Sequence, residues 1–178
     1  LTSGSTWHAA GLLPLFNMSY SVGQVHKYSV NLYSQLEEET GLHAGLSTVS
    51  NIRLATNQDR MDEYLQYRGV AETIGVKVEV LTPDEVIDLW PLANPDGLIG
   101  AIRHPQDGYI QPADLTQALA KGARDRGATI YRHTTVTAIS RTQSGEWKIT
   151  TDKGEITAEH VVSATGNFAR QTGAMVGL

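Results

Sequence analysis

The chain has 178 residues, of which 40% are hydrophobic and 19% charged, a composition typical of one globular domain and not of a disordered or fibrous protein. The formal net charge of −5, with no run of Lys and Arg, argues against nucleic acid as a partner. No apolar stretch approaches the roughly 20 residues of a membrane span, so no membrane association is expected. The absence of cysteine excludes disulfides and thiolate sites, and it favours a reducing compartment.

Three helices are expected in the first 90 residues. After a Gly- and Ser-rich opening, apolar residues recur every three or four positions from Val22 to Leu36, which predicts a helix that ends at Gly41. The same spacing predicts a second helix over residues 59–74. A third helix begins at residues 82–85, where Thr-Pro-Asp-Glu supplies a cap, a proline in the first turn and a capping-box carboxylate.

Strand patterns lie between and after these helices. Residues 44–55 predict a bent strand or a hairpin, and residues 77–81 predict a short strand bounded by glycine and proline. Between Trp90 and Gln111 three prolines and several Gly, Asn and Asp residues predict turns around one strand at residues 98–103. Loops of this density often surround sites.

The last third of the chain contains both the helical spacing of apolar residues and the alternation that is typical of strands. Pro112 opens a helix that runs to Gly127, followed by a strand at residues 128–131. Alternation with period two then predicts an antiparallel meander, and a continuous apolar strand leads into a last helix. These elements cover residues 136–139, 147–151, the surroundings of Ile156, 161–164 and 168–176. The mixture predicts an α/β or α+β body.

One opening segment concentrates residues that could carry chemistry. Gly4–Gly11, Gly-Ser-Thr-Trp-His-Ala-Ala-Gly, is called the Trp-His segment below. Glycine amides and hydroxyl groups suit a pyrophosphate, and a neighbouring imidazole can serve as nucleophile or acid/base. A Gly/Ser loop beside a buried Trp is also common as plain structure. The residues alone leave both interpretations open.

The Trp-His segment resembles the flavin-attachment segment of dimethylglycine and sarcosine dehydrogenases, in which the His of Trp-His carries FAD through its 8α-methyl group. The resemblance continues in order along the whole chain. It includes Leu36–Gly41, Ile52–Thr56, Asp107–Pro112, Gly122–Arg124 and Val162–Gly166. Phe168 stands where relatives often have Trp.

The resemblance implies a cofactor site. His8 is the expected covalent anchor, the Trp-His segment and Leu12 line the isoalloxazine and pyrophosphate, Val136 meets the adenosine half through its backbone, and Phe168 lies beside the flavin. A glycine after a strand lets a helix start approach phosphate, which adds Gly166. The implied cofactor-binding residues are therefore Gly4, Ser5, Thr6, Trp7, His8, Ala9, Ala10, Gly11, Leu12, Val136, Gly166 and Phe168.

The expected organisation is an incomplete FAD-binding domain interleaved with a substrate domain built on a mixed or antiparallel sheet. Residues 1–41 and 112–178 are assigned to the FAD domain and residues 42–111 to the substrate domain. No Gly-x-Gly-x-x-Gly motif follows an opening strand. In the family that unit precedes the Trp-His segment, and a folate-binding region follows later, so the chain is expected to be an internal piece that is inactive alone.

The implied reaction is oxidative N-demethylation of a small N-methyl amino acid such as dimethylglycine or sarcosine. The substrate carboxylate needs a cation, and Arg53 and Arg103 are candidates because each sits in an apolar strand; each could instead form a structural ion pair or reach solvent. Tyr109 could face the flavin or be a packed tyrosine. No metal site is expected, since the other histidines lack ligand spacing. These are His26, His43, His104, His133 and His160.

Three functions remain open on this basis. The first is the dehydrogenase, with an electron-transfer flavoprotein as electron acceptor and tetrahydrofolate as a further cofactor of the full-length protein. The second is a non-covalent FAD amino-acid oxidase that passes electrons to oxygen. The third is a non-catalytic remnant or binding module. Bacterial cytoplasm or, in a eukaryote, the mitochondrial matrix is the expected location.

Overall fold

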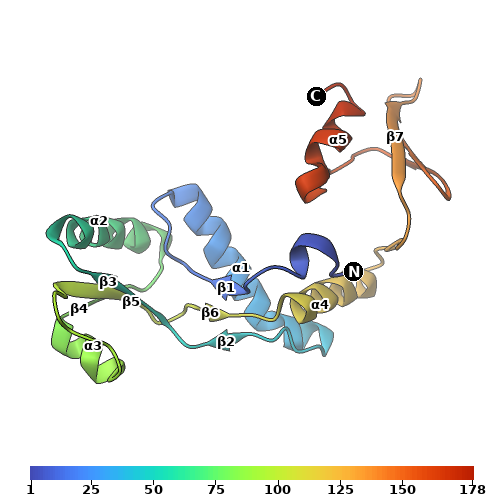
Figure 1. The fold of residues 1–178 in the computed structure, drawn as a ribbon. Helices are drawn as coiled ribbons and strands as arrows, with labels where there is room; N and C mark the ends of the chain where they lie inside the picture. Colours follow the sequence, from blue (N-terminus) through green and yellow to red (C-terminus); the bar gives the residue numbers. More distant parts are fainter. The chain divides into compact units, whose positions relative to one another are not determined.

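The structure is a computed structural model that describes all 178 residues, and the chain divides into two compact units, Leu1–Thr129 and Ile130–Leu178 (Figure 1). None of its helices combines the length and the apolar character that a membrane span requires. The elements of the first unit are η1 (Gly4–Thr6), β1 (Leu12–Leu13), α1 (Tyr20–Thr40), β2 (Ser47–Thr48), β3 (Asn51–Ala55), α2 (Gln58–Ile74), β4 (Glu79–Leu81), α3 (Pro83–Leu89), β5 (Gly100–His104), β6 (Gly108–Tyr109) and α4 (Pro112–Asp125).

A three-stranded antiparallel sheet in the order β3-β5-β4 carries a helix on each face (Figure 1). Successive side chains of a strand point to opposite faces, and the neighbours Ala101 and Ile102 of β5 illustrate this. Ile102 packs in the core formed with α2, which contributes Tyr67 and Ala71. Ala101 packs in a second core around Val86 of α3. Both faces of the central strand β5 are therefore buried, one against α2 and the other against α3.

A second three-stranded sheet, in the order β1-β6-β2, lies beside a pair of packed helices, α1 and α4. Leu36 of α1, Ala118 of α4 and Ile110 after β6 share one hydrophobic core. An ion pair between Arg126 and Glu39, 2.8 Å long, joins the ends of the two helices at the surface. This arrangement holds β6 between the opening segment of the chain and the region around residue 47.

The second unit is a meander followed by short helices. Strands β7 (Val136–Arg141), β8 (Trp147–Thr151) and β9 (Gly154–Ala158) pair antiparallel in that order. An extended stretch leads to η2 (Gly166–Phe168) and α5 (Ala169–Ala174). The predicted mixture of helices and small antiparallel sheets is confirmed. The assignment of segments to an FAD and a substrate domain stays a prediction.

Local signals were reliable for the helices. Thr82 and Glu85 form the predicted capping box at α3, and Gly41 ends α1 in a left-handed conformation with φ of 69°. The stretch 44–55 is a bent strand and not a hairpin, because β2 and β3 pair with different strands and Ser50 bends the chain at φ 66°.

Two predicted strands are wrong. Residues 128–131 and 161–164 form no strand, because neither stretch has a neighbouring strand that satisfies its backbone groups. Val162 is accordingly 88% exposed instead of buried in a sheet. An apolar run provides side chains that can be buried in a sheet, but the hydrogen bonds must come from a second strand.

Candidate functional site

The Trp-His segment forms an exposed turn at the start of the first unit. The backbone N–H groups of Trp7 and His8 donate to the carbonyl oxygens of Gly4 and Ser5, both at 3.2 Å. Trp7 is 74% exposed and His8 is also exposed, so neither ring is part of the core. A Trp buried for structural reasons was the ordinary alternative, and Trp7 is instead exposed. The imidazole is reachable without displacement of other protein groups.

The segment leaves its turn through Gly11, where two requirements both demand glycine. The backbone has a φ of 75°, and an added Cβ would overlap the carbonyl oxygen of Ile110. The Ile110 N–H donates to the Gly11 carbonyl oxygen at 2.8 Å. The next two residues form β1, which pairs with β6. The Trp-His segment is thereby joined to the Asp107–Pro112 motif, which lies about 100 positions later in the chain.

A hollow with a volume of about 440 Å³ lies against the Trp-His segment. Its wall includes the small side chains of Thr6, Ala9 and Ala10 on one side and the apolar side chains of Ile110 and Leu115 on the other. Small residues in a turn keep the backbone accessible, and apolar walls favour a flat, weakly hydrated group. The predicted residues Gly11 and Leu12 also line this hollow, so the structure brings much of the predicted segment to one surface.

Tyr109 lies on β6 directly opposite Leu12 of β1 and Ser47 of β2. Directly opposed residues in antiparallel strands place their side chains on the same face of the sheet. Tyr109 is 49% exposed, and it is therefore not the packed core tyrosine that was the structural alternative. Its position beside Leu12 brings a phenol next to the predicted flavin-binding residues.

The two candidate arginines have different surroundings. Arg103 forms an ion pair with Glu79, with Nη1 and Oε2 3.0 Å apart, which is the structural alternative stated above. The guanidinium of Arg53 instead lies over the ring of Phe16, 4.4 Å from the ring centroid, and no carboxylate forms an ion pair with it. Its Nε is buried without a partner. Of the two, only Arg53 forms no ion pair, although its charge acts on the nearby Asp107 carboxylate.

A buried polar cluster next to Phe16 was missed by the sequence reasoning. Asp107 Oδ1 accepts a hydrogen bond from the Leu15 N–H at 2.9 Å, and the Tyr67 hydroxyl donates to the Leu15 carbonyl oxygen at 3.1 Å. His104 Nε2 lies 3.2 Å from the same hydroxyl. Because that hydroxyl has a single hydrogen, both contacts are satisfied when His104 Nε2 carries the ring proton and donates. A tyrosine at helical spacing offers no signal of such a bond.

Burial shifts the pKa of each member of this cluster. It raises the pKa of Asp107 to about 6, against which the Leu15 hydrogen bond and the nearby Arg53 charge act. It lowers the pKa of His104 to about 4, and Arg53 adds to this effect. It raises the pKa of Tyr67 to about 12, with the charge of Asp107 as a second cause. At neutral pH the cluster holds a neutral histidine, a neutral tyrosine and one carboxylate.

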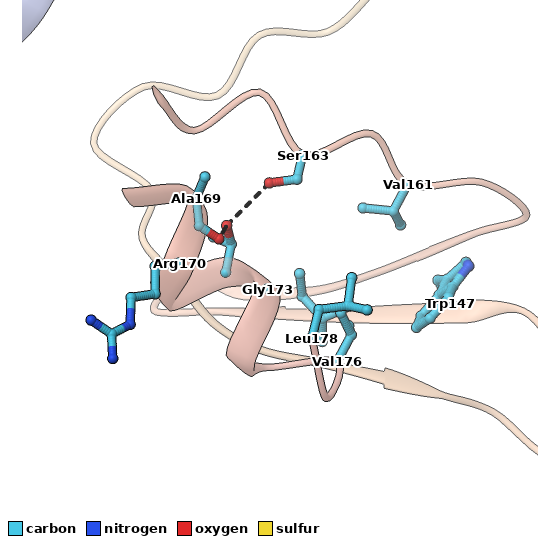
Figure 2. Close-up of a pocket in the computed structure, with 10 residues that line it drawn as sticks. Trp147, Val161, Ser163, Ala169, Arg170, Gly173, Val176 and Leu178 are labelled. Carbon is cyan, nitrogen blue, oxygen red and sulfur yellow. Dashed lines mark hydrogen bonds between the residues drawn. The ribbon is translucent and has the colours of Figure 1, made fainter. Parts of the chain in front are cut away.

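The remaining predicted cofactor residues belong to the second unit. Val136 begins β7 at an irregularity in its pairing with β8, Gly166 has a φ of 54° in η2, and Phe168 ends η2 with its ring exposed. This unit also contains a hollow of about 730 Å³, lined by Trp147 and Val161 among others (Figure 2). None of the three predicted residues lines that hollow.

The profile of the family described as FAD dependent oxidoreductase (DAO) matches residues 1–178. The chain belongs to this family. It is 38% identical over all 178 residues to the mitochondrial dimethylglycine dehydrogenase of Rattus norvegicus and 36% identical over 185 aligned positions to the mitochondrial sarcosine dehydrogenase of Homo sapiens. The whole chain is covered in both comparisons, but it spans only 21% and 20% of those relatives.

A solved structure has the same fold as this DAO-family chain. The crystal structure of glycine oxidase from Geobacillus kaustophilus matches 100% of the chain and 50% of that protein, with a TM-score of 0.81 at 33% sequence identity. The family resemblance inferred from the Trp-His segment is therefore confirmed, as is the fold class. The identities do not distinguish one amine substrate from another.

The residues of the first unit fit the FAD that the DAO family binds. His8 is exposed, and it does not itself line the hollow, whose small and apolar walls include its neighbours Thr6 and Ala9. Gly11 can only be a glycine. A flavin has a flat apolar ring and a polar edge, and these features suit the two kinds of wall. The Trp-His segment would hold the ring, and the chemistry supplied there would be acceptance of a hydride.

Proposed function

We propose that this chain is part of an FAD-dependent dehydrogenase that oxidises the N-methyl group of a small N-methyl amino acid, with FAD linked covalently to His8. The observation that carries the proposal is the exposed imidazole of His8, in a segment that lines a hollow through Thr6 and Ala9 and is joined through Gly11 to the Asp107–Pro112 motif. Dehydrogenases named for dimethylglycine and sarcosine are among the relatives of the chain.

Arg53 is proposed to bind the substrate carboxylate. Its guanidinium is held over Phe16 at 4.4 Å and has no acidic partner, so a carboxylate can approach it without breaking an ion pair. A partly buried guanidinium and a carboxylate form a strong, oriented pair. Tyr109 is proposed to form a wall of the substrate site, because its half-exposed ring shares a face with Leu12.

When bound, FAD supplies the acceptor for the hydride that leaves the N-methyl carbon. The residues of this chain bind and orient: one cation fixes the carboxylate end of the substrate, and the apolar walls exclude water from the reacting methyl group. The resulting iminium product releases formaldehyde after addition of water, or passes its carbon to tetrahydrofolate in the full-length protein. An electron-transfer flavoprotein is the proposed final acceptor.

A second candidate is an amino-acid oxidase with non-covalent FAD that transfers electrons to oxygen. The likeness to glycine oxidase over the whole chain favours this candidate. The two candidates differ in one chemical property, which is whether denaturation releases the flavin from the polypeptide.

The test uses the full-length protein precipitated in acid. Retention of flavin absorbance and fluorescence on the denatured polypeptide supports covalent attachment, complete release supports the oxidase, and absence of flavin from the native protein supports the non-catalytic module. His8→Ala should abolish retention. His160→Ala is the matched control, because His160 is exposed but lies in the second unit, and it should retain flavin as the wild type does. Covalent flavin in the His8→Ala protein would contradict the assigned anchor.

A further inference from the structure

We propose that Asp107 and Tyr67 are positioning residues for the Trp-His segment, which they hold by binding both backbone polar groups of Leu15. The inference rests on the proposed function only for its consequence, the placement of the flavin anchor. The hydrogen bonds themselves belong to the fold. Nothing in the sequence pattern indicates this pair, since Tyr67 lies within a helix and Asp107 lies in a turn.

Asp107 and Tyr67 together hydrogen-bond both backbone polar groups of Leu15, and this pair of bonds is called the grip below. The Leu15 N–H donates to Asp107 Oδ1 at 2.9 Å, and its carbonyl oxygen accepts from the Tyr67 hydroxyl at 3.1 Å. The Leu15 side chain is buried as well, at 3% exposure. Both partners are side chains from distant parts of the chain, so the position of Leu15 is set by tertiary contacts and not by a regular strand. Leu15 lies only four positions after Gly11, the end of the Trp-His segment.

The next residue strengthens the grip. The ring of Phe16 lies 4.4 Å from the ring of Tyr67 and 6.0 Å from that of Tyr64, with His104 at 6.2 Å. Arg53 covers the ring at 4.4 Å. Aromatic pairs at these distances stabilise one orientation beyond the burial of their area. The chain therefore cannot slide past Leu15 without breaking ring contacts and two buried hydrogen bonds.

Asp107 also connects the Trp-His segment to the substrate-side strands. Its backbone carbonyl oxygen accepts from the N–H groups of Val49 and Ser50, at 3.1 and 2.8 Å. The following residues form β6, whose Tyr109 pairs with Leu12. Asp107 thus hydrogen-bonds to two separate stretches of chain, and its own stretch continues into β6. A shift at Asp107 would move the turn at Ser50, Leu15 and Tyr109 together.

The carboxylate of Asp107 interacts with the charged or titratable groups of Arg53 on β3, His26 on α1 and Tyr67 on α2. His104 contacts the Tyr67 hydroxyl. Its second oxygen, Oδ2, is buried without a hydrogen-bond partner. Oδ1, the carboxylate oxygen that has a partner, accepts its hydrogen bond from the Leu15 amide. An amide oxygen can accept the same bond, so asparagine should preserve the grip while alanine should remove it.

The experiment compares Asp107→Ala, Asp107→Asn and Thr40→Val in the full-length protein. Thr40 is a matched control, since it is a buried, hydrogen-bonded residue of the first unit that lies in α1. Hydrogen–deuterium exchange is measured on peptides covering residues 9–16, and the covalently bound flavin fraction and flavin circular dichroism are measured on the same samples. The exchange readout does not depend on flavin.

Asp107→Ala should increase exchange at Leu15 by about tenfold, lower the covalent flavin fraction and change the flavin dichroism. Asp107→Asn should restore all three, and Thr40→Val should lower stability without altering them. Wild-type exchange in Asp107→Ala, or no rescue by Asp107→Asn, would overturn the proposal. If the wild type carries no flavin, the proposed function fails, and the exchange result alone decides whether the grip exists.

Discussion

The amide of Leu15 and the carboxylate of Asp107 form a 2.9 Å hydrogen bond across 92 residues of sequence. Asp107 is 1% exposed, and His104, three residues earlier, is fully buried. An acid, Asp107, and a base, His104, are therefore both buried only three positions apart in the chain. Burial disfavours the charged form of each, and the two groups consequently respond to pH in opposite directions.

Asp107→Asn should steepen the rise of the unfolding free energy with pH. The pKa of Asp107 is raised from 3.8 to about 6, so the folded protein binds more protons than the unfolded chain in this window, and the unfolding free energy falls as the pH rises. The pKa of His104 is lowered from 6.5 to about 4, which has the opposite sign. The contributions offset each other in the wild type. Without the carboxylate, the unfolding free energy should rise by up to about 1.4 kcal/mol per pH unit more than in the wild type between pH 4 and 6.

Urea unfolding at several pH values between 4 and 7 measures this difference. His104→Asn is the matched variant, and its unfolding free energy should decline with rising pH relative to the wild type because the Asp107 contribution remains. Curves for both variants that run parallel to the wild type would show that neither group is perturbed as described.

Removal of the Tyr67 hydroxyl should lower the stability of the folded protein. Tyr67→Phe leaves the Leu15 carbonyl oxygen and the His104 ring N–H buried without partners, which should lower the unfolding free energy by about 2 kcal/mol or more. Tyr28→Phe removes a hydroxyl from a 70% exposed side chain and should change it by less than about 0.5 kcal/mol. Urea unfolding of the two variants should separate them, and equal stabilities would contradict the buried network.

Two glycine-to-alanine changes should alter the stability in opposite directions. Gly108 lies between β1 and β2, and an added Cβ would overlap the backbone carbonyl oxygen of Ser47, so Gly108→Ala should destabilise by about 1–3 kcal/mol. Gly69 lies inside α2 with open space at the Cβ position, and Gly69→Ala should stabilise by about 0.5–1 kcal/mol. The thermal midpoints of the two variants should fall on either side of the wild type. A tolerated Gly108→Ala would show that the three strands can separate freely.

Substrate affinity should distinguish the two arginines. Arg53→Gln should raise KM for an N-methyl amino acid by about tenfold to a hundredfold, the loss expected for a charge-assisted hydrogen bond, with a smaller change in kcat. Arg103→Gln should leave KM near the wild-type value, because Glu79 keeps its 2.7 Å ion pair with Lys77. Steady-state kinetics on the full-length enzyme provide both values. Equal effects of the two changes would remove Arg53 from the substrate site.

Features that depend on neighbours in sequence could be predicted. The spacing of apolar residues located α1 and α2, and Thr82 with Glu85 located the start of α3, because helix hydrogen bonds and caps join residues three or four positions apart. The motif at Gly4–Gly11, with the further matching segments in order along the chain, indicated by resemblance the family that the comparison over the whole chain confirms.

Features that depend on distant partners were decided by the tertiary structure alone. The apolar run at residues 161–164 reads as a strand, yet without a pairing strand its backbone bonds are not made. Arg53 and Arg103 occupy similar strand patterns, and only the packing gives one of them Glu79 and the other the ring of Phe16. The grip of Asp107 on Leu15 is of the same kind, since folding alone creates a hydrogen bond between groups so far apart along the chain.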